Sequence, residues 1–105
     1  MTHPPATVPP DADPADETTD RIRRTVDGIW AIESAKVIAR VARMVGDVGV
    51  AEDLAQDALV AALERWPRSG IPDNPGAWLT ATAKNKAIDL LRRRARLGRK
   101  EQVLG

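Results

Sequence analysis

The chain has 105 residues, of which 43% are hydrophobic and 30% are charged, and its net charge at pH 7 is +1. This length suits one small domain with a single modest core, and the apolar content excludes a chain that is disordered throughout. The sequence has no cysteine, which excludes disulfides and cysteine-ligated zinc. No apolar run is long enough for a membrane span or a signal peptide, so we expect a cytoplasmic protein without a membrane partner.

The aromatic content restricts the kind of core that the chain can form. The only aromatic residues are three tryptophans, Trp30, Trp66 and Trp78. The core must therefore consist mostly of alanine, leucine, valine and isoleucine, and alanine-rich faces let helices approach closely. No segment alternates as a strand does. We predict an all-α fold, a compact bundle of three to four helices with a disordered N-terminal leader.

The leader and the first helix come first in the chain. Residues 1–17 are rich in Pro, Ala, Thr and Asp without apolar periodicity, which predicts a disordered leader. The first helix is expected to start near residues 18–20 and to end at the glycines of residues 46–49. Apolar and small residues recur at helical spacing along it and predict a buried stripe of Trp30, Ser34, Val37, Ile38, Val41 and Val45.

Residues 50–66 show the clearest amphipathic pattern in the chain. The expected buried face consists of Ala51, Leu54, Ala55, Ala58, Leu59, Ala62, Leu63 and Trp66. The opposite face carries Asp53, Gln56, Asp57, Val60 and Glu64. Glu52 and Asp53 are expected in the first turn, where carboxylates complement the helix dipole.

A loop and a third helix are expected to follow. Residues 67–76 contain three prolines and two glycines, which predicts a ten-residue loop. Asp73 or Asn74 can cap the next helix, with Pro75 at its first position. That helix should run into the arginine block and stop near Gly98. Its expected buried arc consists of Leu79, Ala83, Ala87, Leu90 and Leu91.

The third helix also carries the basic charge of the chain. Residues 1–20 hold five acids and no lysine or arginine, whereas residues 84–100 hold eight basic residues and one acid, Asp89. Such asymmetry indicates a local site for a polyanion. Lysine and arginine can neutralise phosphates, asparagine can read a base edge, and tryptophan can stack on an exposed base. The side chains that offer this chemistry are Trp78, Lys84, Asn85, Arg92, Arg93 and Arg96.

Each of these features also has a purely structural interpretation. Arginines at a helix C-terminus satisfy the dipole, and Asp89 can pair with Arg92 or Arg93 at helical spacing. Trp78 is more often a core residue than a stacking platform, and an isolated Asn85 is usually just exposed. The sequence contains no catalytic Ser/His/Asp set, no phosphate-binding glycine loop and no metal-ligand spacing. We therefore expect neither an enzyme nor a bound metal or cofactor.

The order of the second helix, the loop and the third helix is a pattern that few protein families share. The segments AEDLAQDALVAALERW and NPGAWLTATAKNKAIDLLRRRAR, separated by a Pro/Gly-rich loop, resemble region 2 of bacterial sigma-70 family RNA polymerase sigma factors of the extracytoplasmic-function group. The similarity covers roughly residues 30–96. WAIESAKVIARVARMVGD and RSGIPDNPGAWL resemble a subgroup with a long C-terminal extension. Residues 18–97 would then form region 2, and residues 98–105 would begin a linker to a missing C-terminal region 4, in a fragment or a truncated product.

The resemblance also implies partners and site residues. The second helix would dock on the clamp coiled coil of the largest polymerase subunit through Asp53, Gln56, Asp57 and Glu64. The third helix and the preceding loop would melt the −10 promoter element and hold its non-template strand. The implied DNA-binding residues are Arg68, Asp73, Asn74, Trp78, Lys84, Asn85, Arg92, Arg93 and Arg96. An anti-sigma protein or the protein's own C-terminal extension would be a further partner, and the acidic leader would compete with DNA for residues 84–100.

Two other classes of function stay open at this point. One is a helical protein-interaction module whose basic C-terminal helix is incidental. It predicts that the acidic face of the second helix matters and that the third helix does not. The other is a regulator of double-stranded DNA with a helix-turn-helix, which the expected ten-residue loop disfavours because such motifs use a tight turn.

Overall fold

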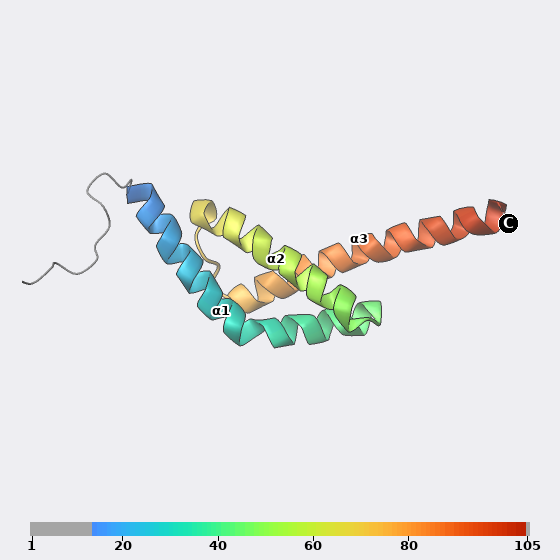
Figure 1. Cartoon of the computed structure of the whole chain (residues 1–105), viewed down its shortest axis with the longest axis horizontal. Helices are drawn as coiled ribbons and strands as arrows, with labels where there is room; N and C mark the ends of the chain where they lie inside the picture. Colours follow the sequence, from blue (N-terminus) through green and yellow to red (C-terminus); the bar gives the residue numbers. More distant parts are fainter. Residues whose placement is uncertain (1–13, 105) are drawn as a thin grey trace, which may run out of the picture.

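The computed structural model describes residues 14–104, with side chains described for residues 17–99. Three helices follow one another: α1 (Pro14–Val45), α2 (Val48–Ser69) and α3 (Pro75–Leu104). Each helix contacts the other two. α2 runs back along the second half of α1, and the second half of α3 projects beyond the bundle (Figure 1). Residues 14–104 contain no strand, which confirms the predicted all-α fold.

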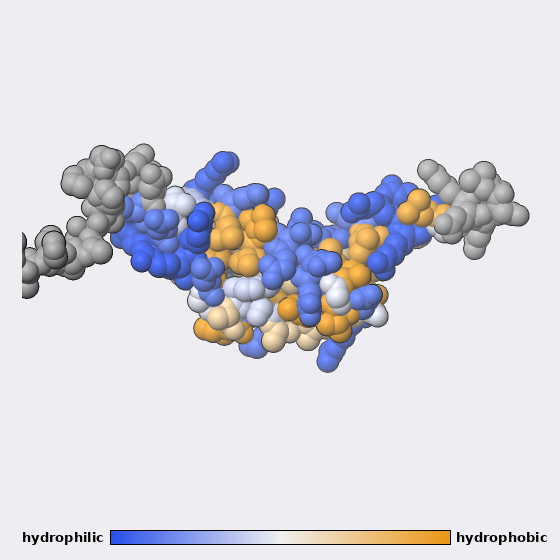
Figure 2. All heavy atoms as spheres, in the orientation of Figure 1, coloured by the Kyte–Doolittle hydropathy of each residue, from blue (hydrophilic) through white to orange (hydrophobic). Residues whose placement is uncertain are grey.

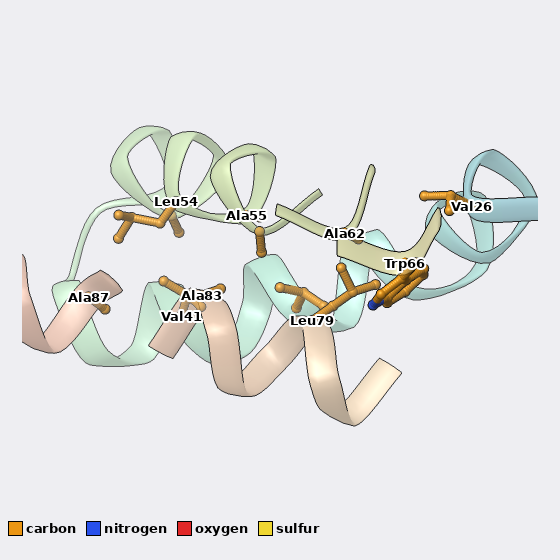
Figure 3. Close-up of a cluster of buried hydrophobic side chains, with 12 residues drawn as sticks. Val26, Val41, Leu54, Ala55, Ala62, Trp66, Leu79, Ala83 and Ala87 are labelled. Atoms are coloured by element: carbon orange, nitrogen blue, oxygen red, sulfur yellow. The ribbon is translucent and has the colours of Figure 1, made fainter. Parts of the chain in front are cut away.

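α1 is longer than predicted and bent. It begins at Pro14 instead of near residues 18–20, and proline is favourable at the first position of a helix. Residues 1–13 of the predicted leader lie outside the described residues. The helix changes direction near its middle (Figure 1). Val26 in its first half lies toward Trp66 at the end of α2, whereas Val41 in its second half lies beside Ala83 of α3 (Figure 3).

The connection between α1 and α2 has the predicted glycine stop. Gly46 adopts a positive φ of 73°, and its N–H donates to the Ala42 carbonyl at 2.8 Å. Asp47 then caps α2 by accepting a hydrogen bond from the Val50 N–H at 3.1 Å. Because α2 begins at Val48, Glu52 and Asp53 fall beyond the first turn, and the prediction that they lie in it is wrong.

All three helices contribute to one buried cluster (Figure 3). It consists of Val26, Val37 and Val41 from α1, Ala51, Leu54, Ala55, Ala58, Ala62 and Trp66 from α2, and Leu79, Ala83 and Ala87 from α3. Alanines dominate the facing surfaces of α2 and α3, as the composition predicted. Leu91, expected in the core, is 36% exposed instead, because α3 has left the bundle by that point.

The predicted ten-residue loop is wrong. Residues 67–69 still belong to the last turn of α2, and α3 already begins at Pro75, so the irregular segment is Gly70–Asn74. Gly70 ends α2 with a φ of 85°, and its N–H donates to the Trp66 carbonyl at 2.8 Å. Proline is compatible with the first helical position, and one missing N–H in a final turn does not end a helix at once. Loop length therefore no longer disfavours a helix-turn-helix.

α3 also ends later than predicted. It continues through Gly98 to Leu104 and so crosses the predicted boundary between residues 18–97 and 98–105. Gly98 does not take a positive φ. A glycine inside a helix costs about 1 kcal/mol relative to alanine, which weakens the helix without terminating it.

Candidate nucleic-acid interface

The polar side of α3 carries the residues expected to contact nucleic acid. Trp78, Asn85 and Arg92 follow one another at seven-residue intervals, which is about two helical turns, so they share one side of α3. Asn85 and Arg92 are exposed, as are Lys84, Arg93 and Arg96. Asn85 and Arg92 face away from the buried arc of Leu79, Ala83 and Ala87, which confirms that α3 is amphipathic.

The arginines lie on the part of α3 that projects from the bundle. Within residues 75–99 of α3, Ala87 is the last buried residue, and residues 91–97 are all exposed. Asp89, Arg92, Arg93, Ala95, Arg96 and Arg99 line an open hollow along this segment. Within the side chains described for residues 17–99, Asp89 forms no ion pair with Arg92 or Arg93, contrary to the structural alternative. The guanidinium groups therefore remain available to an anionic partner.

The surface of this segment is not uniformly polar. Figure 2 shows blue, hydrophilic atoms around the projecting part of α3 with orange patches between them. Among residues 75–99 of α3, the exposed large apolar residues are Ile88, Leu91 and Leu97. A basic helix with interspersed apolar side chains can contact both phosphates and the faces of unstacked bases.

Arg68 and Asp73 lie on the surface at the other end of the expected site. Arg68 is exposed in the last turn of α2 and lines an open hollow with Glu64, Arg65 and Ser69. Asp73 is exposed in the Gly70–Asn74 segment. Both side chains are therefore accessible, and a contact of either with DNA stays a prediction.

Asn74 has a structural role that limits what it can offer to DNA. Its Oδ1 accepts a hydrogen bond from the Ala77 N–H at 3.1 Å, and its carbonyl accepts one from the Trp78 N–H at 3.2 Å. Asn74 therefore caps α3, as the sequence predicted, and Asp73 does not. Only the side-chain NH2 of Asn74 remains to donate to a base or a phosphate.

The cap gives a testable expectation for stability. We expect Asn74→Ala to lower the free energy of unfolding by about 1 kcal/mol, because the Ala77 N–H loses its acceptor. Asn74→Ser should lower it by much less, since a serine hydroxyl also caps. Urea unfolding followed by circular dichroism measures both. Equal losses for the two variants would contradict the capping role, and DNA contacts of Asn74 should be tested with the serine variant.

The Trp78 side chain lies partly in the core and partly on the surface. Its ring lies edge-on to that of Trp66, with ring centroids 5.2 Å apart and an interplanar angle of 66°. Trp78 is half-buried and packs against the core cluster. The structural interpretation is thus confirmed for part of the ring. Stacking of a base on the rest of the ring stays a prediction.

The outer face of α2 forms a second accessible surface. Asp53, Gln56, Asp57 and Glu64 are all exposed on the side opposite the buried face, as predicted. Val60, in the middle of these residues, is 50% exposed. The face thus combines an apolar centre with acidic and amide groups around it, a composition suited to a protein partner.

One contact beside the expected site was not predicted from the sequence. Gly76, the second residue of α3, is buried against Glu33 of α1. A Cβ atom on Gly76 would lie 2.5 Å from Glu33 Oε2. The one local signal was a glycine in the first turn of a helix, where a better helix former is usual.

Among the side chains of residues 17–99, no group of three or more His, Cys, Asp and Glu could hold a metal ion. None of the helices within residues 14–104 combines the length and the apolar character needed to cross a membrane.

Comparison with known proteins defines the class to which this bundle belongs. Residues 32–97 match the family described as Sigma-70 region 2. That class is made up of sigma-factor domains. Because the match covers more than half of the sequence, the chain belongs to the sigma-70 region 2 family. The matched segment includes all of α2, the Gly70–Asn74 segment and the part of α3 that carries Asn85 and Arg92.

A curated relative extends the comparison. An uncharacterized protein of Rhizobium meliloti (strain 1021) is 42% identical to this chain over 50 residues. The aligned segment is 48% of this chain and 12% of that protein, so the chain spans only a small part of the relative's length. No solved structure matches the chain.

Proposed function

We propose that this chain is the region 2 domain of a sigma factor of the extracytoplasmic-function group. In this proposal it recognises and melts the −10 promoter element by holding the non-template strand. The observation that carries the proposal is the family match over residues 32–97 together with the accessible polar side of α3. Its partners would be the RNA polymerase core and promoter DNA, in the cytoplasm.

Capture of the strand would use both ends of α3. Arg92, Arg93 and Arg96 on the projecting segment would neutralise phosphates, and each such contact adds roughly 0.7 to the log–log salt slope of single-strand binding. Asn85 would read a base edge with its amide donor and acceptor. The neighbouring Lys84 would also contact the strand. The Gly70–Asn74 segment would hold an extruded base, with Arg68 and Asp73 as hydrogen-bonding groups. Unstacking a base costs a few kcal/mol, which such contacts must offset.

Docking on polymerase would use the outer face of α2. Asp53, Gln56, Asp57 and Glu64 would face the clamp coiled coil of the largest subunit, and Val60 would supply an apolar contact at the centre. Charge complementarity of this kind mainly raises the association rate and fixes the orientation of the partners. The docking face belongs to α2 and the strand-holding side to α3, so one domain can engage both partners together.

Further partners belong to the same proposal. An anti-sigma protein or the protein's own C-terminal extension would regulate the domain. Competition by the acidic leader is less favoured by the geometry. Pro14 and the end of α3 lie at opposite ends of the molecule (Figure 1).

Strand capture can be tested with fluorescent single-stranded oligonucleotides across a salt series. We expect the parent chain to prefer some sequences of a panel over others. Asn85→Ala should reduce this preference, because a base contact is lost. Arg92→Ala should weaken binding to all sequences alike and lower the log–log salt slope by about 0.7.

The control for this experiment lies on the same side of the same helix. Asp89→Ala removes an acid between Asn85 and Arg92, so it should strengthen binding of all sequences slightly and leave the preference unchanged. Salt-sensitive binding of the parent without any sequence preference would reduce the site to a basic patch. Absence of binding even at low salt would refute strand capture by this domain.

A helical protein-interaction module is the second candidate. The observation that favours it is the half-exposed Val60 among the acidic residues of α2, which is typical of the centre of an interface. This candidate predicts that substitutions on α3 leave partner binding unchanged, whereas substitutions around Val60 abolish it.

A further inference from the structure

The contact between Glu33 and Gly76 lies where the Gly70–Asn74 segment joins α3. Gly76 is the second residue of α3 and is buried, and Glu33 is a half-buried residue in the middle of α1. A Cβ atom built on Gly76 would lie 2.5 Å from Oε2, 2.7 Å from Cδ and 3.3 Å from Cγ of Glu33. Only glycine leaves room for the carboxylate at this distance.

The Glu33 carboxylate lies beside the start of α3. The first N–H groups of a helix carry partial positive charge and lack intrahelical partners. In α3, Pro75 has no N–H, the Ala77 N–H donates to Asn74 Oδ1, and the Trp78 N–H donates to the Asn74 carbonyl. Asn74 of the Gly70–Asn74 segment thus caps the first turn of α3. The Glu33 side chain of α1 adds a negative charge beside the same turn.

We propose that Glu33 is a positioning residue that holds the first turn of α3, and with it the Gly70–Asn74 segment, against α1, and that Gly76 is required for this approach. The inference rests on the proposed capture of a DNA strand by this segment. Glu33 itself contacts no DNA. Its carboxylate fixes the orientation of the residues that do, while the arginines on the projecting part of α3 are too far along the helix to depend on it.

The contact separates sequence preference from general affinity. Loss of the Glu33 charge frees the first turn of α3, so the residues around the loop lose their fixed orientation. Phosphate contacts of Arg92, Arg93 and Arg96 remain, because these residues lie on the exposed segment of residues 91–97, beyond the buried Ala87. Substitutions at this contact should therefore reduce the sequence preference and leave the salt slope of binding unchanged.

The experiment compares Gly76→Ala, Glu33→Ala and Glu33→Gln in the full chain, with the panel of single-stranded oligonucleotides. We expect Gly76→Ala and Glu33→Ala each to reduce the ratio of affinities for the preferred and the least preferred oligonucleotide by about two- to fivefold, the range for a charge at a helix terminus. The double variant should lose no more than either single variant, because both remove the same contact. Glu33→Gln should recover little of the loss, since the amide keeps the size of the side chain but removes its charge.

The matched control is Gly28→Ala, because Gly28 is also helical and a Cβ there meets nothing within 4 Å. It should bind as the parent does. The Glu33 atoms near Gly76 lie at the end of a flexible side chain, so Gly76→Ala should still fold, which thermal unfolding checks.

The outcomes distinguish this inference from the proposed function. A parent chain without sequence preference refutes strand capture itself. A selective parent with Gly76→Ala and Glu33→Ala unchanged overturns the positioning role alone. Glu33→Ala and Glu33→Gln could instead raise the affinity for all oligonucleotides equally while Gly76→Ala changes nothing. Glu33 would then only repel DNA, which also overturns the positioning role.

Discussion

Trp66→Ala should lower the free energy of unfolding by about 3–5 kcal/mol, the range for removing a large buried aromatic side chain. Trp66 is 1% exposed and is the largest fully buried side chain of the core. It lies where the end of α2 meets the first half of α1 and the start of α3. Its removal also ends the edge-on contact with Trp78, which contributes about 0.5–1.5 kcal/mol beyond area burial. Domains of this size have a total stability of about 5–15 kcal/mol.

Trp66→Phe is the informative comparison. The indole Nε1 of Trp66 is buried without a hydrogen-bond partner, and an unsatisfied buried donor costs about 1–3 kcal/mol. Phenylalanine is smaller but has no such donor, so the two effects oppose each other. We expect a net loss below about 1.5 kcal/mol for Trp66→Phe.

Urea unfolding followed by circular dichroism measures both variants, because tryptophan fluorescence would itself change. The slope of free energy against urea should stay constant if the denatured state is unaffected. A loss for Trp66→Phe as large as that for Trp66→Ala would indicate that the indole nitrogen is satisfied, for instance by a bound water.

Local patterns in the sequence were sufficient to predict much of this fold. The face from Ala51 to Trp66 was predicted because apolar residues recur every three to four positions, and a helix has one way to bury such a stripe. The Asn74 cap was predicted because capping involves residues only three apart. Both features depend on neighbours along the chain, so no knowledge of the tertiary structure was needed.

Features that depend on distant segments could not be predicted in this way. Leu91 continues the apolar arc of α3, but the pattern does not say where α1 and α2 stop covering it. Prolines at residues 67 and 75 suggested a long loop, although each is compatible with the end or the start of a helix. The contact of Gly76 with Glu33 joins residues 43 positions apart, and neither residue carries a local signal of the other.

In the candidate site, too, features set by local patterns were predicted and features set by contacts between helices were not. The exposure of Asn85 and Arg92 followed from helical periodicity alone. The role of Trp78 did not, because its position on the helix places it between the two faces. Its partner Trp66 comes from another helix, and only the packing of α2 on α3 reveals the ring contact.

Reversal of charge on the outer face of α2 should have the largest effect on binding to a protein partner. We expect Asp53→Lys combined with Asp57→Lys to weaken binding to the RNA polymerase core by about 100-fold, since like charges across an interface cost several kcal/mol. Both residues are exposed on one side of α2, and the core cluster does not include them. The double variant should therefore fold as the parent does.

The two candidate functions are separated when polymerase binding and single-strand binding are both measured, for the α2 double variant and for an α3 variant. Single-strand binding of the Asp53/Asp57 double variant should be no weaker than that of the parent, while Arg92→Ala should bind polymerase core normally in the absence of DNA. Asp20→Lys combined with Asp27→Lys is the matched control, because both are exposed acids of α1 and lie outside the docking face of α2. If the double variant bound polymerase core as tightly as the parent, docking through α2 would be refuted. If it lost that binding and the parent also ignored single strands, the protein-interaction module would be favoured, because only the α2 face would then have a partner.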